Sequence, residues 1–185
     1  MAAEKKRPTE AIYQMKVTLK NIQPPIWRRF QVPGRISLKK LHRIIQTLMP
    51  WDGYHLHQFI IDGVDYGEPD PEGDLSELKD DRYARLNKVV PAAPDRFIYE
   101  YDFGDGWEHE ILVEKVLPPE EGVRYPICLA GKRACPPEDC AVSLDTPVFW
   151  KQFGTQSMKT TRASCNGSAG ASIRKPLVRT ISTTG

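Results

Sequence analysis

Apolar and polar residues alternate along much of the chain, as expected for strands that bury one face. The clearest case is residues 97–111, where two alternating runs flank Gly104-Asp105-Gly106 and predict a β-hairpin. A two-residue loop would put the two apolar faces on opposite sides of the hairpin. We therefore expect a three-residue loop with Gly106 in the left-handed conformation. That register gives three pairs: Phe103 with Trp107, Tyr101 with His109, and Tyr99 with Ile111.

The remaining pattern predicts further strands and one long helix. After a plausible N-cap at Ser37, apolar residues recur at helical spacing until Pro50. Residues 83–90 fit either a short strand or a helical turn. Strands are expected at 12–20, 26–32, 56–61, 64–66 and 126–129, with Asp62-Gly63 as a hairpin turn. This order predicts an α+β domain, in which an antiparallel sheet carries one main amphipathic helix packed on a face.

Composition places the chain among ordinary globular proteins. It has 185 residues, of which 40% are hydrophobic and 27% charged. No apolar run approaches the roughly 20 residues that cross a bilayer, so we expect no membrane contact. Residues 1–10 are polar, lack the apolar core of a signal peptide and are expected to form a disordered leader. These features predict a cytoplasmic protein with reduced cysteines.

Charge is distributed unevenly along the chain. From Ala141 onward there are six basic residues and one acidic residue, Asp145, whereas the preceding residues are net acidic. The formal net charge of +2 therefore comes from the C-terminal part of the chain. Non-specific nucleic-acid binding needs a concentrated basic surface, to which the composition of the body gives little support.

Several stretches together resemble one family, the plasmid pRiA4b ORF-3-like proteins. The resemblance covers roughly residues 11–140, and it is carried mainly by the hairpin and by the motif Cys-Pro-Pro-Glu-Asp-Cys at 135–140. It implies a prokaryotic protein associated with plasmids or mobile elements, and some members are labelled transposon passenger TnpR. No biochemical activity is established for the family. A serine recombinase needs a nucleophilic serine activated by an arginine cluster, which this body does not recognisably offer.

Residues 141–185 depart from the family pattern, which continues with a glycine-rich turn and an acidic helix. Read two bases later with permitted codons, the stretch from Ala141 to Arg162 can encode GVSGYTSFLEAIRDPEHEDHE, which has the character of that helix. We therefore expect residues 141–185 to be an atypical, poorly ordered tail produced by a frame shift. No function is inferred from its positive charge.

Three cysteines could take part in a metal site. Cys128, Cys135 and Cys140 would need a fourth ligand, a histidine or Cys165, to hold zinc. Paired Cys-x-x-Cys knuckles are absent, so structural thiols are the favoured interpretation, and a divalent metal such as zinc stays the alternative.

Histidines and carboxylates offer a second kind of candidate site. His55 and His57 flank Leu56, so on one strand both would point to one side, with His109 on the neighbouring hairpin. His42 faces away from the leucines of its helix and is expected to be solvated. Four carboxylates would crowd one face of the hairpin, and the favoured interpretation is a solvated face with salt bridges. The alternatives are that a divalent cation, or Arg28 and Arg29 on an adjacent strand, offsets their repulsion. These carboxylates are Glu100, Asp102, Glu108 and Glu110.

These observations predict a binding or accessory module rather than a self-sufficient enzyme. The candidate groove lies where the hairpin meets residues 54–57 and 135–140. Its candidate binding residues are Tyr54, His57, Asp102, Asp105, Trp107, His109 and Glu110.

The first alternative is a metal-dependent hydrolase or nuclease that uses His57, His109 and the carboxylates. The second is a DNA-binding accessory to recombination, with Arg28, Arg29, Lys39, Lys40 and Arg43 as its basic residues. The sequence names no catalytic residue, no particular protein or nucleic-acid partner and no oligomeric state.

Overall fold

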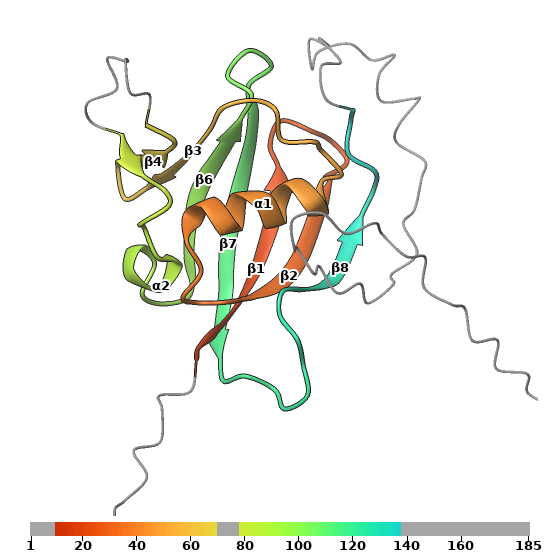
Figure 1. Ribbon diagram of the computed structural model, residues 1–185. Coiled ribbons are helices and arrows are strands. Elements are labelled where there is room, and N and C mark those ends of the chain that lie inside the picture. Colours follow the sequence, from red (N-terminus) through yellow and green to blue (C-terminus); the bar gives the residue numbers. More distant parts are fainter. Residues whose placement is uncertain (1–9, 70–77, 138–185) are drawn as a thin grey trace, which may run out of the picture.

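The computed structural model describes residues 10–69 and 78–137. Within these ranges one eight-stranded sheet has the strand order β5-β4-β3-β6-β7-β1-β2-β8 (Figure 1). The strands are β1 (Ile12–Leu19), β2 (Trp27–Pro33), β3 (His57–Ile61), β4 (Val64–Gly67), β5 (Lys79–Asp80), β6 (Asp95–Tyr101), β7 (Trp107–Leu117) and β8 (Ile127–Lys132). The helices are α1 (Leu38–Leu48) and the single turn α2 (Leu86–Val89).

The sheet is antiparallel except at one edge. All neighbouring strands pair antiparallel apart from β4 and β5, which run parallel. The predicted antiparallel sheet with few helices is therefore confirmed in its main lines, although the sheet is mixed. Residues 83–90, for which the sequence allowed a short strand or a helical turn, contain the helical turn α2.

One face of the sheet, here called the inner face, is covered by α1 (Figure 1). Alternate residues of β1, β2, β6 and β7 point into this interface and are buried, as the alternating pattern predicts. The helix contributes Leu38, Leu41 and Ile45, none of which is accessible to solvent. The other face, here called the outer face, carries mostly charged and polar side chains.

Helix α1 begins and ends close to the expected residues. Ser37 is the N-cap, and its side-chain oxygen accepts a hydrogen bond from the Lys40 backbone N–H at 3.2 Å. The turn at Asp62-Gly63 is also confirmed, since both residues have positive φ, as a type I′ hairpin turn requires.

The predicted register of the β6–β7 hairpin is wrong by two residues. Tyr101 pairs with Trp107 and Tyr99 with His109, so the loop contains five residues, Asp102–Gly106. Asp102 causes the difference: its φ is +57°, and its carboxylate accepts hydrogen bonds from the backbone N–H groups of Gly104 at 3.0 Å and Asp105 at 3.3 Å. Gly106 has φ +66°, as expected. A shift of two residues preserves which side chains face inward, so the apolar pattern does not distinguish the two registers.

Arg28 is buried on the inner face, at the C-terminal end of α1. Its guanidinium donates hydrogen bonds to the carbonyls of Leu48 at 3.0 Å, Trp27 at 2.9 Å and Lys132 at 3.1 Å. Leu48 ends α1, so the arginine satisfies a carbonyl that has no partner within the helix and places a positive charge at the negative end of the helix dipole. Burial lowers the pKa of Arg28. Arg28 therefore joins three elements: α1, β2 and β8.

Replacing Arg28 with methionine should destabilise the protein. The substitution Arg28→Met leaves the Leu48 and Lys132 carbonyls without their donor, which costs roughly 2–3 kcal/mol of unfolding free energy. The control is Arg96→Met, because Arg96 is exposed on the outer face and pairs with Glu110; its loss should cost less than about 1 kcal/mol. Urea denaturation of both variants measures the difference. Equal midpoints would show that the Arg28 contacts do not support the fold.

Candidate functional site

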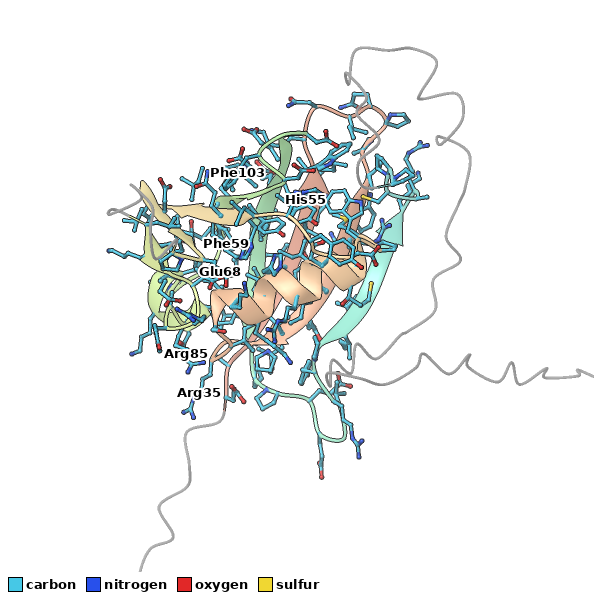
Figure 2. The ribbon with its side chains drawn as sticks, turned by 45° about the horizontal axis from the view of Figure 1, so that its top comes forward. Arg35, His55, Phe59, Glu68, Arg85 and Phe103 are labelled. Atoms are coloured by element: carbon cyan, nitrogen blue, oxygen red, sulfur yellow. The ribbon has the colours of Figure 1, made fainter. Side chains whose placement is uncertain are left out.

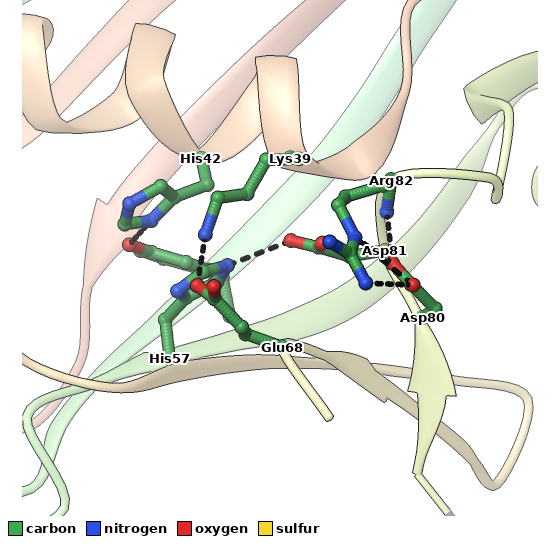
Figure 3. A network of polar contacts seen from close by, with 8 residues as sticks. Lys39, His42, His57, Glu68, Asp80, Asp81 and Arg82 are labelled. Atoms are coloured by element: carbon green, nitrogen blue, oxygen red, sulfur yellow. Dashed lines mark hydrogen bonds and ion pairs between the residues drawn. The ribbon is translucent and has the colours of Figure 1, made fainter. Parts of the chain in front are cut away.

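A buried polar cluster lies between α1 and strands β3 and β6. It consists of His42, Gln46, His57, Asp81 and Tyr99 and is called the histidine cluster below. Figure 3 shows His42, His57 and Asp81 of this cluster. The rings of His42 and His57 stack at 3.6 Å between centroids. The Tyr99 hydroxyl lies 2.8 Å from both His42 Nδ1 and Gln46 Nε2, and His57 Nε2 lies 2.8 Å from Asp81 Oδ2.

Local sequence explains how these side chains meet. His42 and Gln46 are four residues apart on α1 and therefore lie on one side of the helix. Tyr99 points inward from β6, where buried residues alternate with half-buried ones, and His57 begins the neighbouring strand β3. Asp81 follows β5, and its backbone carbonyl accepts a hydrogen bond from Lys39 N–H at 3.2 Å, which positions it beneath the start of α1.

The histidine cluster is shielded from water. Asp81 has no accessible surface, and its Oδ1 has no hydrogen-bond partner among the described residues. Burial, the neighbouring His57, and then Lys39 and Arg43 lower the pKa of His42 to about 2. His42 therefore stays neutral at physiological pH. Lys39 pairs with Glu68 at the solvent edge of this region, and Arg82 pairs with Asp80 nearby (Figure 3).

A third buried histidine, His109, belongs to an aromatic layer around Trp51. The Trp51 ring lies 5.3 Å from both Tyr101 and His109 and 5.5 Å from Trp107, centroid to centroid. His109 Nδ1 is 3.0 Å from the Trp107 carbonyl. Burial lowers the pKa of His109 to about 4, against the opposing effect of its backbone hydrogen bonds. His109 Nε2 and Trp107 Nε1 have no hydrogen-bond partner among the described residues.

The carboxylates of the hairpin lie on the opposite, outer face. Each is paired: Glu100 accepts a hydrogen bond from Gln58 at 2.7 Å, Glu108 pairs with Lys20 at 2.6 Å, and Glu110 pairs with Arg96 at 3.3 Å. Asp102 is not part of this face, because it caps the hairpin loop. The expectation that Arg28 and Arg29 offset these charges is wrong, since Arg29 pairs with Glu114 at 2.7 Å.

The predicted site residues are thus divided between three places. His57 and His109 are buried on the inner face, whereas Glu110 is on the outer face and Tyr54 is at the end of the sheet. Strand alternation separates them, because His109 and Glu110 are adjacent in β7 and point to opposite sides. Acid–base catalysis by His57, His109 and Glu110 would need them within reach of one substrate. The described residues do not provide that arrangement.

Two of the three candidate zinc cysteines are described. The side chains of Cys128 and Cys135 are half-buried, and burial raises the pKa of the Cys128 thiol. Cys135 Sγ lies 3.7 Å from Met49 Sδ, which is a packing contact with the end of α1. No three histidine, cysteine or acidic side chains within the described ranges could hold a metal ion together. Cys140 lies outside these ranges, so the three-cysteine site stays a prediction.

The end of the sheet exposes three large apolar side chains. Tyr54 is 82% exposed, Leu56 60% and Phe103 47%, and these three residues are called the apolar tip below. The Asp102 N–H donates to the Leu56 carbonyl at 2.9 Å, and His55 Nε2 lies 3.5 Å from Asp102 Oδ2. These contacts hold the loop before β3 against the hairpin loop, and Figure 2 shows His55 and Phe103 together at this end.

Sequence reasoning missed most of the histidine cluster. His42 was expected to be solvated but is 6% exposed, which corrects that expectation. A signal was available, because Leu38, His42 and Ile45 follow one another at the helical spacing of the buried face. Asp81 carried no such signal, since it lies in an acidic stretch that reads as a loop.

Comparison with known proteins identifies the class. The profile described as "Plasmid pRiA4b ORF-3-like protein" matches residues 11–151, so the chain belongs to this family. It is 38% identical over 129 residues to the uncharacterized protein y4hQ of Sinorhizobium fredii (strain NBRC 101917 / NGR234), covering 70% of this chain and 66% of y4hQ. The chain thus spans slightly less than two thirds of that relative.

A solved structure has the same fold. The crystal structure of the protein of unknown function MM3350 from Methanosarcina mazei Go1 superposes with a TM-score of 0.64 and is 42% identical. The match covers 71% of this chain and 74% of MM3350. Neither relative carries a biochemical function in its name, and no specific activity follows from the family.

Acid should weaken the fold through its buried histidines. His109 is neutral when folded but gains a proton near pH 6.5 when unfolded, so the unfolded state binds more protons below that pH. The contribution of neutral His109 to the free energy of unfolding is fully present above pH 6.5 and is lost as the pH falls toward about 4. Between pH 7 and 5 this loss is roughly 2 kcal/mol. Denaturant titrations at several pH values measure the free energy of unfolding of the wild type and of His109→Phe. We expect this free energy to fall less with decreasing pH in the variant. An equal pH dependence in both proteins would show that His109 is not responsible for the effect.

The frame-shift hypothesis for residues 141–185 can be tested on the gene. These residues lie outside the described ranges, and the family match extends to residue 151, beyond the boundary expected at 140. We predict that resequencing across codons 139–143 finds nucleotides that permit the helix-like reading two bases later. A gene sequence that does not permit this reading would exclude the hypothesis.

Proposed function

We propose that this domain is a binding module that contacts a protein partner through the apolar tip. The observation that carries the proposal is the exposure of Tyr54, Leu56 and Phe103 on two loops that the hydrogen bond from Asp102 N–H to the Leu56 carbonyl holds together. Large exposed aromatic and aliphatic side chains are costly to leave in water and are typical of the anchors of protein interfaces. An accessory role linked to plasmids or mobile elements is consistent with the family's name.

Charge around the apolar tip indicates the kind of partner. The hairpin loop that carries Phe103 contains Asp102 and Asp105 and no basic residue. Asp102 is 8% exposed and lies beside His55, so Asp105 is the carboxylate that gives this border of the tip a negative charge. An acidic border repels nucleic-acid phosphates and attracts cations. The proposed partner therefore presents a segment that combines apolar and basic side chains.

The two alternatives from the sequence have less support. A metal-dependent hydrolase needs its histidines and carboxylates to converge, and the described candidates lie on opposite faces of the sheet. The DNA-binding alternative relied on five basic residues: Arg28, Arg29, Lys39, Lys40 and Arg43. It has less support because Arg28 is buried, whereas Arg29 and Lys39 are paired with Glu114 and Glu68. Within residues 10–69 and 78–137, no helix is long and apolar enough to cross a membrane.

Site-specific photo-crosslinking in host cells tests the proposal. The photoreactive analogue p-benzoylphenylalanine replaces Phe103, Tyr54 or, as a control, Val116, which is 39% exposed on β7. We expect one discrete heterologous adduct from positions 103 and 54 and none from 116. Adding Leu56→Ser should reduce the adduct at position 103 at least fivefold without changing the thermal unfolding midpoint.

The crosslinked peptide decides the partner chemistry. Mass spectrometry should locate it in a segment of another protein that carries lysine or arginine beside apolar residues. An equal yield at position 116, an adduct unaffected by Leu56→Ser, or an acidic crosslinked segment would contradict the proposal. An adduct of twice the mass of the chain would instead make the tip an interface between copies of this protein.

A further inference from the structure

A basic surface lies at the end of the domain opposite to the apolar tip. Arg35, in the connection after β2, lies beside Arg85, and Lys88 follows Arg85 by three residues in the α2 segment. All three residues are exposed. Arg85 Nη1 donates to the Arg35 carbonyl at 3.4 Å, and the Leu86 N–H donates to the Ile36 carbonyl at 3.0 Å. Figure 2 shows Arg35 and Arg85 together, away from Phe103.

The cations of this surface are not neutralised by the described residues. Arg35, Arg85 and Lys88 form no ion pair with a described carboxylate, in contrast to Arg82 and Lys39 nearby, which pair with Asp80 and Glu68. Holding like charges close together without a counter-charge is unfavourable. An anionic partner would remove that cost, so the arrangement points to a polyanion.

An exposed aromatic ring narrows the kind of polyanion. Tyr83 is 77% exposed and precedes Arg85 by two residues, so their Cα atoms are at most about 7 Å apart. The Arg82 guanidinium lies 5.9 Å from the Tyr83 ring. Cations that bind phosphates beside a ring on which a base stacks are the combination found in proteins that bind single-stranded nucleic acid. A duplex, whose bases are already stacked, has no such use for the ring.

We propose that Arg35, Tyr83, Arg85 and Lys88 form a binding surface for single-stranded nucleic acid. The cations hold consecutive phosphates, and one base stacks on Tyr83. This surface is separate from the apolar tip and does not depend on it. Tyr83, Arg85 and Lys88 are close together in the sequence, and the fold adds Arg35, which is 50 residues before Arg85.

Fluorescence anisotropy with a labelled oligothymidine of 12 nucleotides tests the proposal on the full chain. The double substitution Arg85→Glu with Lys88→Glu should weaken binding at least tenfold. Because each lost phosphate contact removes about 0.7 from the slope of log K against log salt, the slope should flatten by about 1.4. Tyr83→Ala should weaken binding at least fivefold and leave the salt slope unchanged.

The control is the double substitution Arg124→Glu with Lys132→Glu, which reverses two exposed charges outside the basic surface. It should change affinity less than threefold, and circular dichroism verifies folding of every variant. If the control loses as much affinity for the oligonucleotide as the Arg85 and Lys88 variant does, binding depends on the overall charge of the protein and the proposed site is wrong. Polyglutamate binding as tightly as the oligonucleotide, with no effect of Tyr83→Ala, would assign the surface to an acidic protein instead.

Discussion

The packing of α1 on β6 determines the interior of this domain, because one long helix covers the inner face of the described sheet. Its buried side includes the polar residues His42 and Gln46, both of which reach the hydroxyl of Tyr99. A buried polar group without a partner costs more than an apolar group in its place. The Tyr99 hydroxyl therefore keeps both contacts only if α1 lies at one rotation and one height on the sheet. Arg28 adds a second constraint at the helix C-terminus, through the Leu48 carbonyl.

Much of the fold was predictable because its elements follow simple periodicities. Helix α1 begins after Ser37, and β1 to β4 lie within a residue or two of the expected ranges. The hairpin register was not predictable from the pattern, because a shift of two residues leaves the same side chains inside. Asp102 decides it through hydrogen bonds within the loop, an effect that competes with the shorter turn. The strand β5 and its parallel pairing with β4 had no visible periodic signal in only two residues.

The candidate site was predictable only in part, for a related reason. Leu56 and His55, in the loop before β3, do contact Asp102 of the hairpin loop. His57, His109 and Glu110 do not come together, because side chains alternate along β7 and those of His109 and Glu110 point to opposite faces of the sheet. Asp81 enters the interior through tertiary contacts that no local pattern reveals, whereas His42 lies on the buried face of α1 at the helical spacing of its apolar residues. A histidine among the apolar residues of a helix can interrupt the buried face or be buried with a hydrogen-bond partner. For His42 the partner is the Tyr99 hydroxyl, whose position is known only from the fold.

The two proposed surfaces lie on a framework that gives little opportunity for coupling between them. The apolar tip depends on the β6–β7 loop and on the residues before β3, whereas Arg35 and Arg85 lie on segments joined to each other by backbone hydrogen bonds. Between them are the inner-face side chains of β6 and β7, which are buried and closely packed. Coupling between two sites requires an element with two arrangements, and a filled core of stacked rings and paired strands offers none. The binding free energies of the two surfaces should then add, so the domain would hold a protein partner and a nucleic-acid strand at its two ends independently.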